Sequence, residues 1–207
     1  MDRILGVIGA GDLGKQIAHY AISDNHYDHV VFFDDFIEAG KDNVIGKVVD
    51  VENSYKNGLF NDLIIAIGYK HLKFKEEIYN KFKNSIPLGT IIHSSSWVDK
   101  TAIINAGSVI FPNCTIDLNV KIGFNSILNL GCTISHDSTL GNHCFLSPKV
   151  SIAGFTQIGE KCIIGINSTI IDNLIICDNT QIGAGGIVIK NILKEGLYVG
   201  NPVRLLR

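Results

Sequence analysis

A histidine and a carboxylate stand side by side at His136 and Asp137, within the segment Ile134-Ser135-His136-Asp137. Imidazole takes up a proton near neutral pH, and a neighbouring carboxylate can orient it, so such a pair can act as a general base. The same two residues can also be a hydrogen-bonded histidine and its neighbour at a surface corner. Judged on these residues alone, the surface interpretation is favoured.

A glycine-rich segment, Gly9-Ala10-Gly11-Asp12-Leu13-Gly14, follows an apolar stretch at residues 3–8. We expect that stretch to be a strand and residues 15–23 to be an amphipathic helix. Glycines between a strand and a helix expose backbone N–H groups that can hold a phosphate. By itself the motif is weak, because glycines also occur wherever the chain turns tightly.

A second predicted strand, residues 29–33, ends in Asp34-Asp35. An acidic residue about 20 positions beyond such a loop can meet a ribose or a base. The remaining elements predicted before the repeat are strands at residues 62–68 and 90–93 and a helix at residues 70–84. Four strands make half of a dinucleotide-binding fold, with room for one mononucleotide rather than NAD. The sequence therefore predicts an α/β half-Rossmann domain of βαβαβ type at residues 1–95.

Every sixth residue from Ile104 to Val188 is Ile, Leu or Val, and Val98 and Ile92 extend this phase backwards. Four positions after each of these apolar residues comes a mostly small one. This second column includes four of the five cysteines: Cys114, Cys132, Cys144 and Cys162. Small residues at a fixed interval fit a narrow interior, where cysteine behaves as a small hydrophobic residue. The spacing therefore disfavours a disulfide framework or a zinc site.

A third column, one residue before the small one, is Gly or Asn at nine positions: Gly107, Asn113, Asn119, Asn125, Gly131, Asn167, Asn173, Asn179 and Gly185. Both residue types tolerate the left-handed backbone that a sharp corner between short strands needs. Three hexads then make one triangular turn of a parallel β-helix. Fifteen hexads, from residue 104 to residue 193, predict five coils in a second domain at residues 96–207.

The chain resembles the hexapeptide-repeat acyltransferases in two segments. One is a repeat unit, Ile158-Gly159-Glu160-Lys161-Cys162, and the other is the late Val199-Gly200-Asn201-Pro202-Val203-Arg204. That resemblance implies a left-handed parallel β-helix and a homotrimer with active sites between subunits. With the glycine-rich loop and the strand ends at Asp34-Asp35 and Ala66-Ile67-Gly68, the whole chain resembles the sialic acid O-acetyltransferase family. One branch of that family N-acetylates UDP-, dTDP- or GDP-linked amino sugars, as in bacillosamine and perosamine pathways.

The resemblance implies a role for each candidate site residue. His136 would be the general base, Asp137 would orient it, and Asn129 would lie near the reacting group of the sugar. The nucleotide of the substrate would meet Gly11, Asp12, Leu13, Asp34, Asp35 and Gly68. Acetyl-CoA, the co-substrate, would meet Phe145, Gly154, Ile166, Ala184 and Pro202. Phe145 stands where many relatives carry a second histidine, and Ala184 stands where a glycine is frequent.

Gly154 lies 18 residues, one predicted coil, beyond His136. A glycine there leaves space open, and we expect a backbone N–H near Gly154 to help bind the oxyanion that forms when an amine attacks a thioester. No cluster of ligands predicts a metal site, and the proposed chemistry needs none.

The 207 residues carry a formal net charge of −2, with 46% hydrophobic and 18% charged residues. This balance gives no reason to expect nucleic-acid binding, and no apolar run is long enough for membrane insertion. The composition favours a cytoplasmic protein, and the resemblance implies an enzyme that N-acetylates a nucleotide-linked 4-amino-4,6-dideoxy sugar for surface glycan biosynthesis. Two alternatives stay open: O-acetylation of sialic acid or a related free sugar, and a non-catalytic solenoid scaffold.

Overall fold

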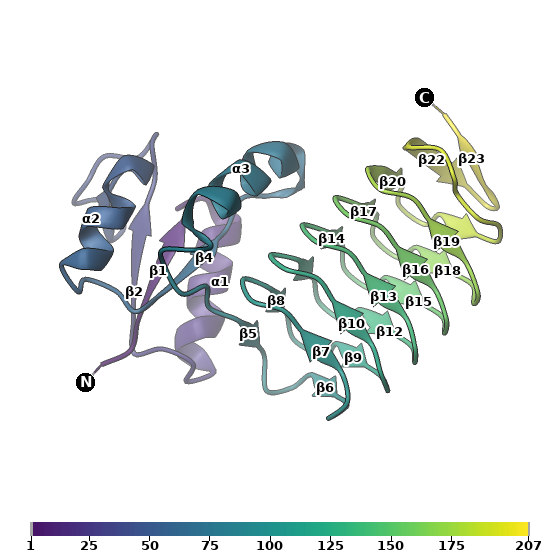
Figure 1. Cartoon of the computed structure of the whole chain (residues 1–207), viewed down its shortest axis with the longest axis horizontal. Helices are drawn as coiled ribbons and strands as arrows, with labels where there is room; N and C mark the ends of the chain where they lie inside the picture. Colours follow the sequence, from purple (N-terminus) through teal and green to yellow (C-terminus); the bar gives the residue numbers. More distant parts are fainter. Residues whose placement is uncertain (1, 207) are drawn as a thin grey trace. The chain divides into compact units, whose positions relative to one another are not determined.

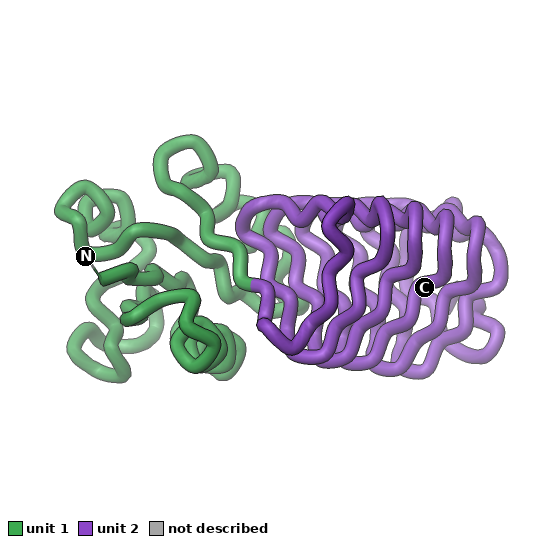
Figure 2. Tube along the Cα trace, turned by 90° about the horizontal axis from the view of Figure 1, so that it is seen from below, with its two compact units in different colours: residues 1–91 green, residues 92–207 purple. Residues whose placement is uncertain are grey.

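A computed structural model describes residues 2–206, and the chain divides into a first unit that ends at Ile91 and a second that begins at Ile92 (Figure 2). The sequence-based boundary lay four residues later, between residues 95 and 96.

The first unit is built on a parallel sheet with the strand order β3-β2-β1-β4 (Figure 1). Its strands are β1 (Ile4–Ile8), β2 (His29–Phe33), β3 (Val44–Gly46) and β4 (Asp62–Ile65). Its helices are α1 (Asp12–Ser23), α2 (Val51–Lys56) and α3 (Leu72–Phe82), with short 3-10 turns η1 (Val48–Asp50) and η2 (Tyr69–His71). Apolar residues of the strands and of α3 form one core, which includes Ile8, Phe33, Leu63, Ile78 and Phe82.

The predicted α/β class of this unit is confirmed, but three details of the prediction were wrong. Strand β3 and helix α2 were not predicted, because three and six residues are too few for a hydrophobic period to emerge. The predicted strand at residues 90–93 does not join this sheet: its central residues form β5 (Ile91–Ile92), which pairs within the second unit's sheets. Helix α1 begins at Asp12, three residues before the predicted start.

The second unit is a solenoid whose strands stack into three sheets, called here the first, second and third faces (Figure 1). The first face contains β5, β8 (Val109–Ile110), β11 (Ile127–Leu128), β14 (Phe145–Leu146), β17 (Ile163–Ile164), β20 (Thr180–Ile182), β22 (Gly196–Gly200) and β23 (Val203–Leu205). The second face contains β6 (Trp97–Val98), β9 (Thr115–Ile116), β12 (Thr133–Ile134), β15 (Ser151–Ile152), β18 (Thr169–Ile170) and β21 (Ile187–Val188). The third face contains β7 (Ile103–Ile104), β10 (Lys121–Ile122), β13 (Thr139–Leu140), β16 (Gln157–Ile158) and β19 (Ile175–Ile176). Most strands have two residues and pair in parallel; the last strand, β23, pairs antiparallel with β22.

Burial in the solenoid follows the two predicted interior columns. In the apolar column Ile104 is half-buried, and every later member, at each sixth residue from Ile110 to Val188, is buried. The small column is buried as well, and its polar members are satisfied by the neighbouring coils. The Ser126 hydroxyl, for example, accepts from the Cys144 N–H at 3.1 Å and donates to the Gly141 carbonyl at 3.1 Å. A buried hydroxyl paired in this way avoids the cost of an unsatisfied polar group.

The corners have the left-handed backbone that the Gly and Asn column predicted. All nine predicted positions have a positive φ, from 54° at Asn125 to 80° at Gly107. Five further corners carry residues that gave no such signal: Asp137, His143, Lys149, Phe155 and Lys161. A bulky residue in this conformation is a genuine outlier, so Phe155, with a φ of 55°, marks a strained corner.

Candidate active site

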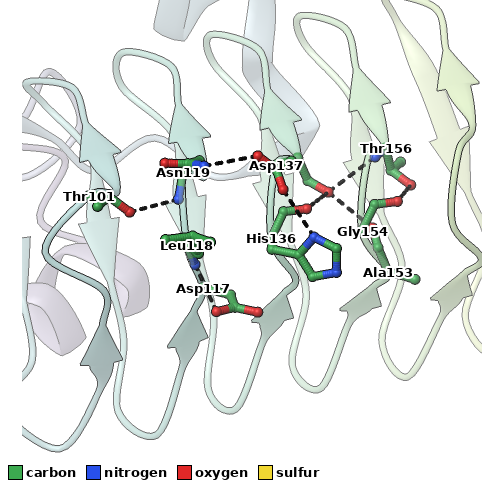
Figure 3. A network of polar contacts seen from close by, with 10 residues as sticks. Thr101, Asp117, Leu118, Asn119, His136, Asp137, Ala153, Gly154 and Thr156 are labelled. Carbon is green, nitrogen blue, oxygen red and sulfur yellow. Dashed lines mark hydrogen bonds and ion pairs between the residues drawn. The ribbon is translucent and has the colours of Figure 1, made fainter.

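His136 and Asp137 follow β12, in the turn from the second face to the third, which we call the second–third edge. His136 Nδ1 lies 3.1 Å from Asp137 Oδ2, and their side chains are 46% and 34% exposed (Figure 3). A carboxylate only accepts hydrogen bonds, so this contact assigns the proton to Nδ1 and leaves the lone pair on Nε2. Nε2 is therefore the nitrogen able to take up a proton from a substrate.

The carboxylate of Asp137 is held from its other side by Asn119, whose Nδ2 donates to Oδ1 at 3.0 Å (Figure 3). The hydrogen bond from Asn119, followed by the one from His136, lowers the pKa of Asp137 below its ordinary value. The Asp137 carboxylate is therefore ionised at any pH at which the neutral imidazole can act as a base.

The next coil supplies the surroundings of the imidazole. A Cβ atom on Gly154 would lie 2.8 Å from His136 Cε1 and 2.9 Å from Nε2, so only glycine leaves room for the ring. The Phe155 ring meets the imidazole edge-on, with the ring centroids 5.1 Å apart and the planes at 86°. The predicted stacking of Gly154 beyond His136 is thus present, and the glycine makes space for the base itself.

The other residues proposed to bind substrate or acetyl-CoA on the solenoid lie elsewhere. Asn129, Ile166 and Ala184 follow β11, β17 and β20, in the turn from the first face to the second, the first–second edge. Phe145 lies on β14 and is 7% exposed, so little of its side chain is open to a ligand. Within one chain, the structure therefore brings His136 together with Gly154 but not with Asn129, Ile166 or Ala184.

Pro202 lies between β22 and β23 and lines a cavity of about 410 Å³. The same cavity is lined by two cationic residues, Lys190 and Arg204, and by Tyr198. Cations beside an open cavity can pair with phosphate groups. The sequence analysis named Pro202 as a contact of acetyl-CoA and included Arg204 only as part of the late segment, whereas Lys190 was missed.

In the first unit, a cavity of about 370 Å³ opens at the carboxyl ends of the parallel strands. Open α/β sheets bind ligands at this end, where neighbouring strands connect in opposite directions. Of the residues predicted to bind a nucleotide, Asp34, Asp35 and Gly68 line the cavity, and the glycine-rich loop contributes Gly9. The cavity is not lined by the rest of the predicted set: Gly11, which caps helix α1, and Asp12 and Leu13, its first two residues.

The two acidic residues of this cavity have different surroundings. Asp34 Oδ2 accepts from the Ala10 N–H at 2.8 Å, and its Oδ1 accepts from Phe36 and Ile37. Asp34 therefore ties the glycine-rich loop to the loop after β2. Asp35 is exposed and accepts one such bond, from the Val48 N–H at 3.0 Å.

Aromatic residues at the cavity were missed by sequence reasoning. Phe36 is 96% exposed while lining the cavity, and Phe74 and His71 line it from the α3 side. An exposed aromatic ring beside a cavity can stack on a planar ring of a ligand. Phe36 directly follows Asp34-Asp35 in the chain, and this place after the acidic pair was the signal available.

The described part of the chain, residues 2–206, contains neither a membrane-spanning helix nor a cluster of metal ligands. No helix in that range is long and apolar enough to cross a bilayer. No group of three or more His, Cys, Asp or Glu side chains in that range lies close enough together to hold a metal ion.

Comparison with known proteins connects both units to one group of enzymes. Residues 4–82 match the family model of the PglD N-terminal domain. The whole chain is similar to the acetyltransferase domain of PglB from Neisseria gonorrhoeae FA1090, with 29% identity, a TM-score of 0.91 and coverage of 99% of this chain and 100% of that one. The complex of that domain with acetyl coenzyme A matches at 28% identity, a TM-score of 0.91 and full coverage of both chains.

More distant structures share the fold. PerB from Caulobacter crescentus, in complex with CoA and GDP-perosamine, is 24% identical over 98% of this chain and 97% of that one, with a TM-score of 0.91. WeeI from Acinetobacter baumannii AYE is 22% identical over 99% of this chain and 100% of that one, with a TM-score of 0.86. No curated protein sequence matches the chain. The structural likenesses confirm the predicted fold, an α/β unit followed by a left-handed β-helix, and the predicted enzyme class, acetyltransferase.

Proposed function

From the premise that the first unit belongs to the PglD N-terminal domain family, we propose that this acetyltransferase N-acetylates a nucleotide-linked amino sugar. The acetyl group comes from acetyl-CoA, and the acceptor is a 4-amino-4,6-dideoxy sugar on its way to a surface glycan. The first unit holds the nucleotide, and the solenoid carries the transfer. The acetyltransferase domain of PglB, which has been solved with acetyl coenzyme A, supports the choice of acetyl donor.

The observation that carries the proposal is the hydrogen-bonded pair of His136 and Asp137 beside Gly154. An amine must lose a proton as it attacks a thioester, and a neutral imidazole nitrogen can accept that proton. Asp137 fixes the Nδ1–H tautomer, so Nε2 serves as the base and Asp137 stabilises the imidazolium that results. A backbone N–H near Gly154 remains our proposed donor to the oxyanion.

The first-unit cavity supports the nucleotide half of the proposal. Its volume and its position at the strand ends suit one mononucleotide. We propose that Asp35 meets the ribose or the base and that Gly68, with Gly11, Asp12 and Leu13 at the start of α1, lies along the phosphates. Asp34 acts by shaping the loop, since its oxygens already accept three backbone N–H groups.

The distribution of the solenoid residues supports assembly as a homotrimer. His136 and Gly154 lie on the second–third edge, whereas Asn129, Ile166 and Ala184 lie on the first–second edge. Around a threefold axis, one edge of a triangular prism faces a different edge of its neighbour. We therefore propose that Asn129 of one copy completes the sugar site at His136 of the next, with Ile166 and Ala184 beside the pantetheine of acetyl-CoA. Pro202, Lys190 and Arg204 are proposed to lie near its nucleotide end.

All five cysteines are free thiols, and four of them are buried in the solenoid. Free thiols in this number fit a reducing compartment, which supports a cytoplasmic location. The location also fits an enzyme that consumes acetyl-CoA.

Ligand-dependent melting tests the proposed binding of a nucleotide. A ligand that binds only the folded protein raises the melting temperature in a concentration-dependent way. We expect one of UDP, dTDP and GDP to raise it, and the same shift to be lost in Asp35→Ala. If none of the three shifts the melting temperature, the nucleotide-linked acceptor is wrong, and a free sugar or a scaffold role takes its place.

Treatment of the acetylated product with hydroxylamine separates the two acyl acceptors. An O-acetyl ester is cleaved by this nucleophile under mild conditions, whereas an N-acetyl amide survives. We expect a product that survives. A cleaved product would move the assignment to O-acetylation.

A further inference from the structure

Three consecutive coils contribute to one line of hydrogen bonds along the second–third edge (Figure 3). The backbone N–H of Asn119 donates to Thr101 Oγ1 at 2.8 Å. The side-chain Nδ2 of Asn119 then donates to Asp137 Oδ1 at 3.0 Å. Thr101 is itself anchored, since its hydroxyl donates to Asp99 Oδ1 at 2.6 Å. The line ends at His136, whose Nδ1 meets the second carboxylate oxygen.

This arrangement divides the two oxygens of Asp137 between two partners. Oδ1 accepts from Asn119 and Oδ2 accepts from His136, so the carboxylate is fixed in rotation about its Cβ–Cγ bond. The backbone of the corner is fixed as well, because the Asp137 N–H donates to the Leu118 carbonyl at 2.9 Å. A carboxylate exposed as much as this one would otherwise rotate freely in solvent.

We propose that Asn119 is a positioning residue of the acetyl transfer: it orients the Asp137 carboxylate so that His136 keeps its proton on Nδ1 and presents Nε2 to the acceptor amine. The inference rests on the proposed function, since it takes His136 to be the base. It adds a residue that lies one coil from His136 and reaches it only through Asp137.

The chemistry of residue 119 separates this role from a purely structural one. Both corners are left-handed, with a φ of 57° at Asn119 and 56° at Asp137. Asn, Asp and Gly all tolerate that backbone, so the corner alone accepts any of the three. Only Asn offers an N–H donor to the carboxylate, and a carboxylate at this position would repel Asp137.

The amide of a corner Asn on this edge does not always reach along the solenoid. Asn173 occupies the same edge two coils beyond Asp137, and its Nδ2 donates to its own neighbour, Asp172, at 2.6 Å. Asn119 instead reaches the next coil. A residue at the third–first edge serves as the control: Asn179 is exposed and has a φ of 56°, which matches the backbone of Asn119.

The experiment compares Asn119→Asp and Asn119→Gly with Asn179→Asp and Asn179→Gly in the full chain. Two readouts are taken: kcat and KM with acetyl-CoA and the active acceptor, and the tautomer of His136 in long-range ¹⁵N–¹H spectra of the histidine rings. Removing a hydrogen bond to a charged group is expected to lower kcat about 10-fold in both Asn119 variants, with the KM for acetyl-CoA unchanged. The same variants are expected to lose Nδ1–H tautomer, and both Asn179 variants are expected to match the wild type.

A wild-type tautomer and kcat in Asn119→Asp would overturn the positioning role, because that variant keeps the corner and loses the donor. A loss of kcat with no change in tautomer would overturn it too. His136→Ala, assayed in parallel, keeps the two proposals apart. If His136→Ala retains full turnover, the base assignment itself fails; if His136→Ala is inactive while Asn119→Asp is normal, only the positioning role fails.

Discussion

The imidazole of His136 occupies the space that a side chain on Gly154 would fill, since a Cβ atom there would lie 2.8 Å from His136 Cε1. The two residues are one coil apart on the second–third edge, so the stacking of the solenoid sets their approach. The glycine is needed for the position of the base and not for an unusual backbone. This relationship yields the first prediction.

Gly154→Ala is expected to keep the fold and to displace the His136 ring. A misplacement of about 1 Å at a reacting group can lower a rate about 100-fold, and we expect a fall in kcat of that order. Steady-state kinetics with a thermal melt checks both parts. Full activity in a normally folded Gly154→Ala would mean that the observed ring position does not matter for catalysis.

Phe155 combines a strained backbone with an edge-on contact to His136. Phe155→Asn relieves the strain, since Asn tolerates a positive φ, and we expect the free energy of unfolding to rise by about 1 kcal/mol. Activity is expected to fall at the same time, because the imidazole loses its aromatic neighbour. Denaturant unfolding and kcat measure the two effects.

Lys161→Asn is the matched control, at a corner with a φ of 54° on the third–first edge. It should leave kcat at the wild-type value. Should Phe155→Asn destabilise the protein and leave kcat unchanged, the corner would serve packing rather than the site.

Two alanine substitutions in the glycine-rich loop are expected to have different effects on stability. A Cβ on Gly14 would collide with the Gly9 carbonyl oxygen, whereas a Cβ on Gly11 would meet nothing within 4 Å. Gly14→Ala is therefore expected to destabilise the first unit by about 1–3 kcal/mol or more, since that size is typical of core overpacking. Gly11→Ala should melt like the wild type. Equal melting of the two variants would show that the loop adjusts freely.

The lowered pKa of Asp137 leads us to expect that the stability of the fold depends on pH. Its pKa is lowered in the folded state by the hydrogen bonds from Asn119 and then His136. A lowered folded pKa means that the stabilisation is present above the unfolded pKa, about 3.9, and is lost as the pH falls through the folded value. The difference in unfolding free energy between the wild type and Asp137→Asn should therefore shrink in acid, as the pH falls below about 3.9 and through the folded pKa of Asp137.

Urea unfolding of both proteins between neutral and acidic pH measures that difference. In the Asn119→Gly background the difference at neutral pH should be smaller, since the largest cause of the lowered pKa is gone. A difference that stays unchanged or grows below about pH 3.9 would contradict the sign of this prediction.

Much of the solenoid was predictable because its physical rule repeats. Cys144 and Ser126 were expected inside from their place in the hexad, and both are fully buried. The corner at Asn119 was expected from the residue type and has the predicted backbone. The corner at Phe155 was not, because its conformation is imposed by the neighbouring coils against the preference of the residue itself.

The first unit was harder to predict where elements are short or where a side chain serves the backbone. Strand β3 has three residues and showed no period. Asp34 was expected to meet a ligand, yet its oxygens hold the Ala10, Phe36 and Ile37 N–H groups. Such a role depends on where two loops meet in space, and no spacing in the chain encodes it. The contact of Asn119 with Asp137, by contrast, could have been found from their separation of one coil.

The central claim is tested most directly by the release of free CoA thiol from acetyl-CoA. The assay is run with UDP-, dTDP- and GDP-linked 4-amino sugars and with free sialic acid, for the wild type and for His136→Ala. We predict turnover with one nucleotide-linked amine and a rate about 10²- to 10⁴-fold lower in His136→Ala. Turnover with sialic acid alone, or a fully active His136→Ala, would contradict the account.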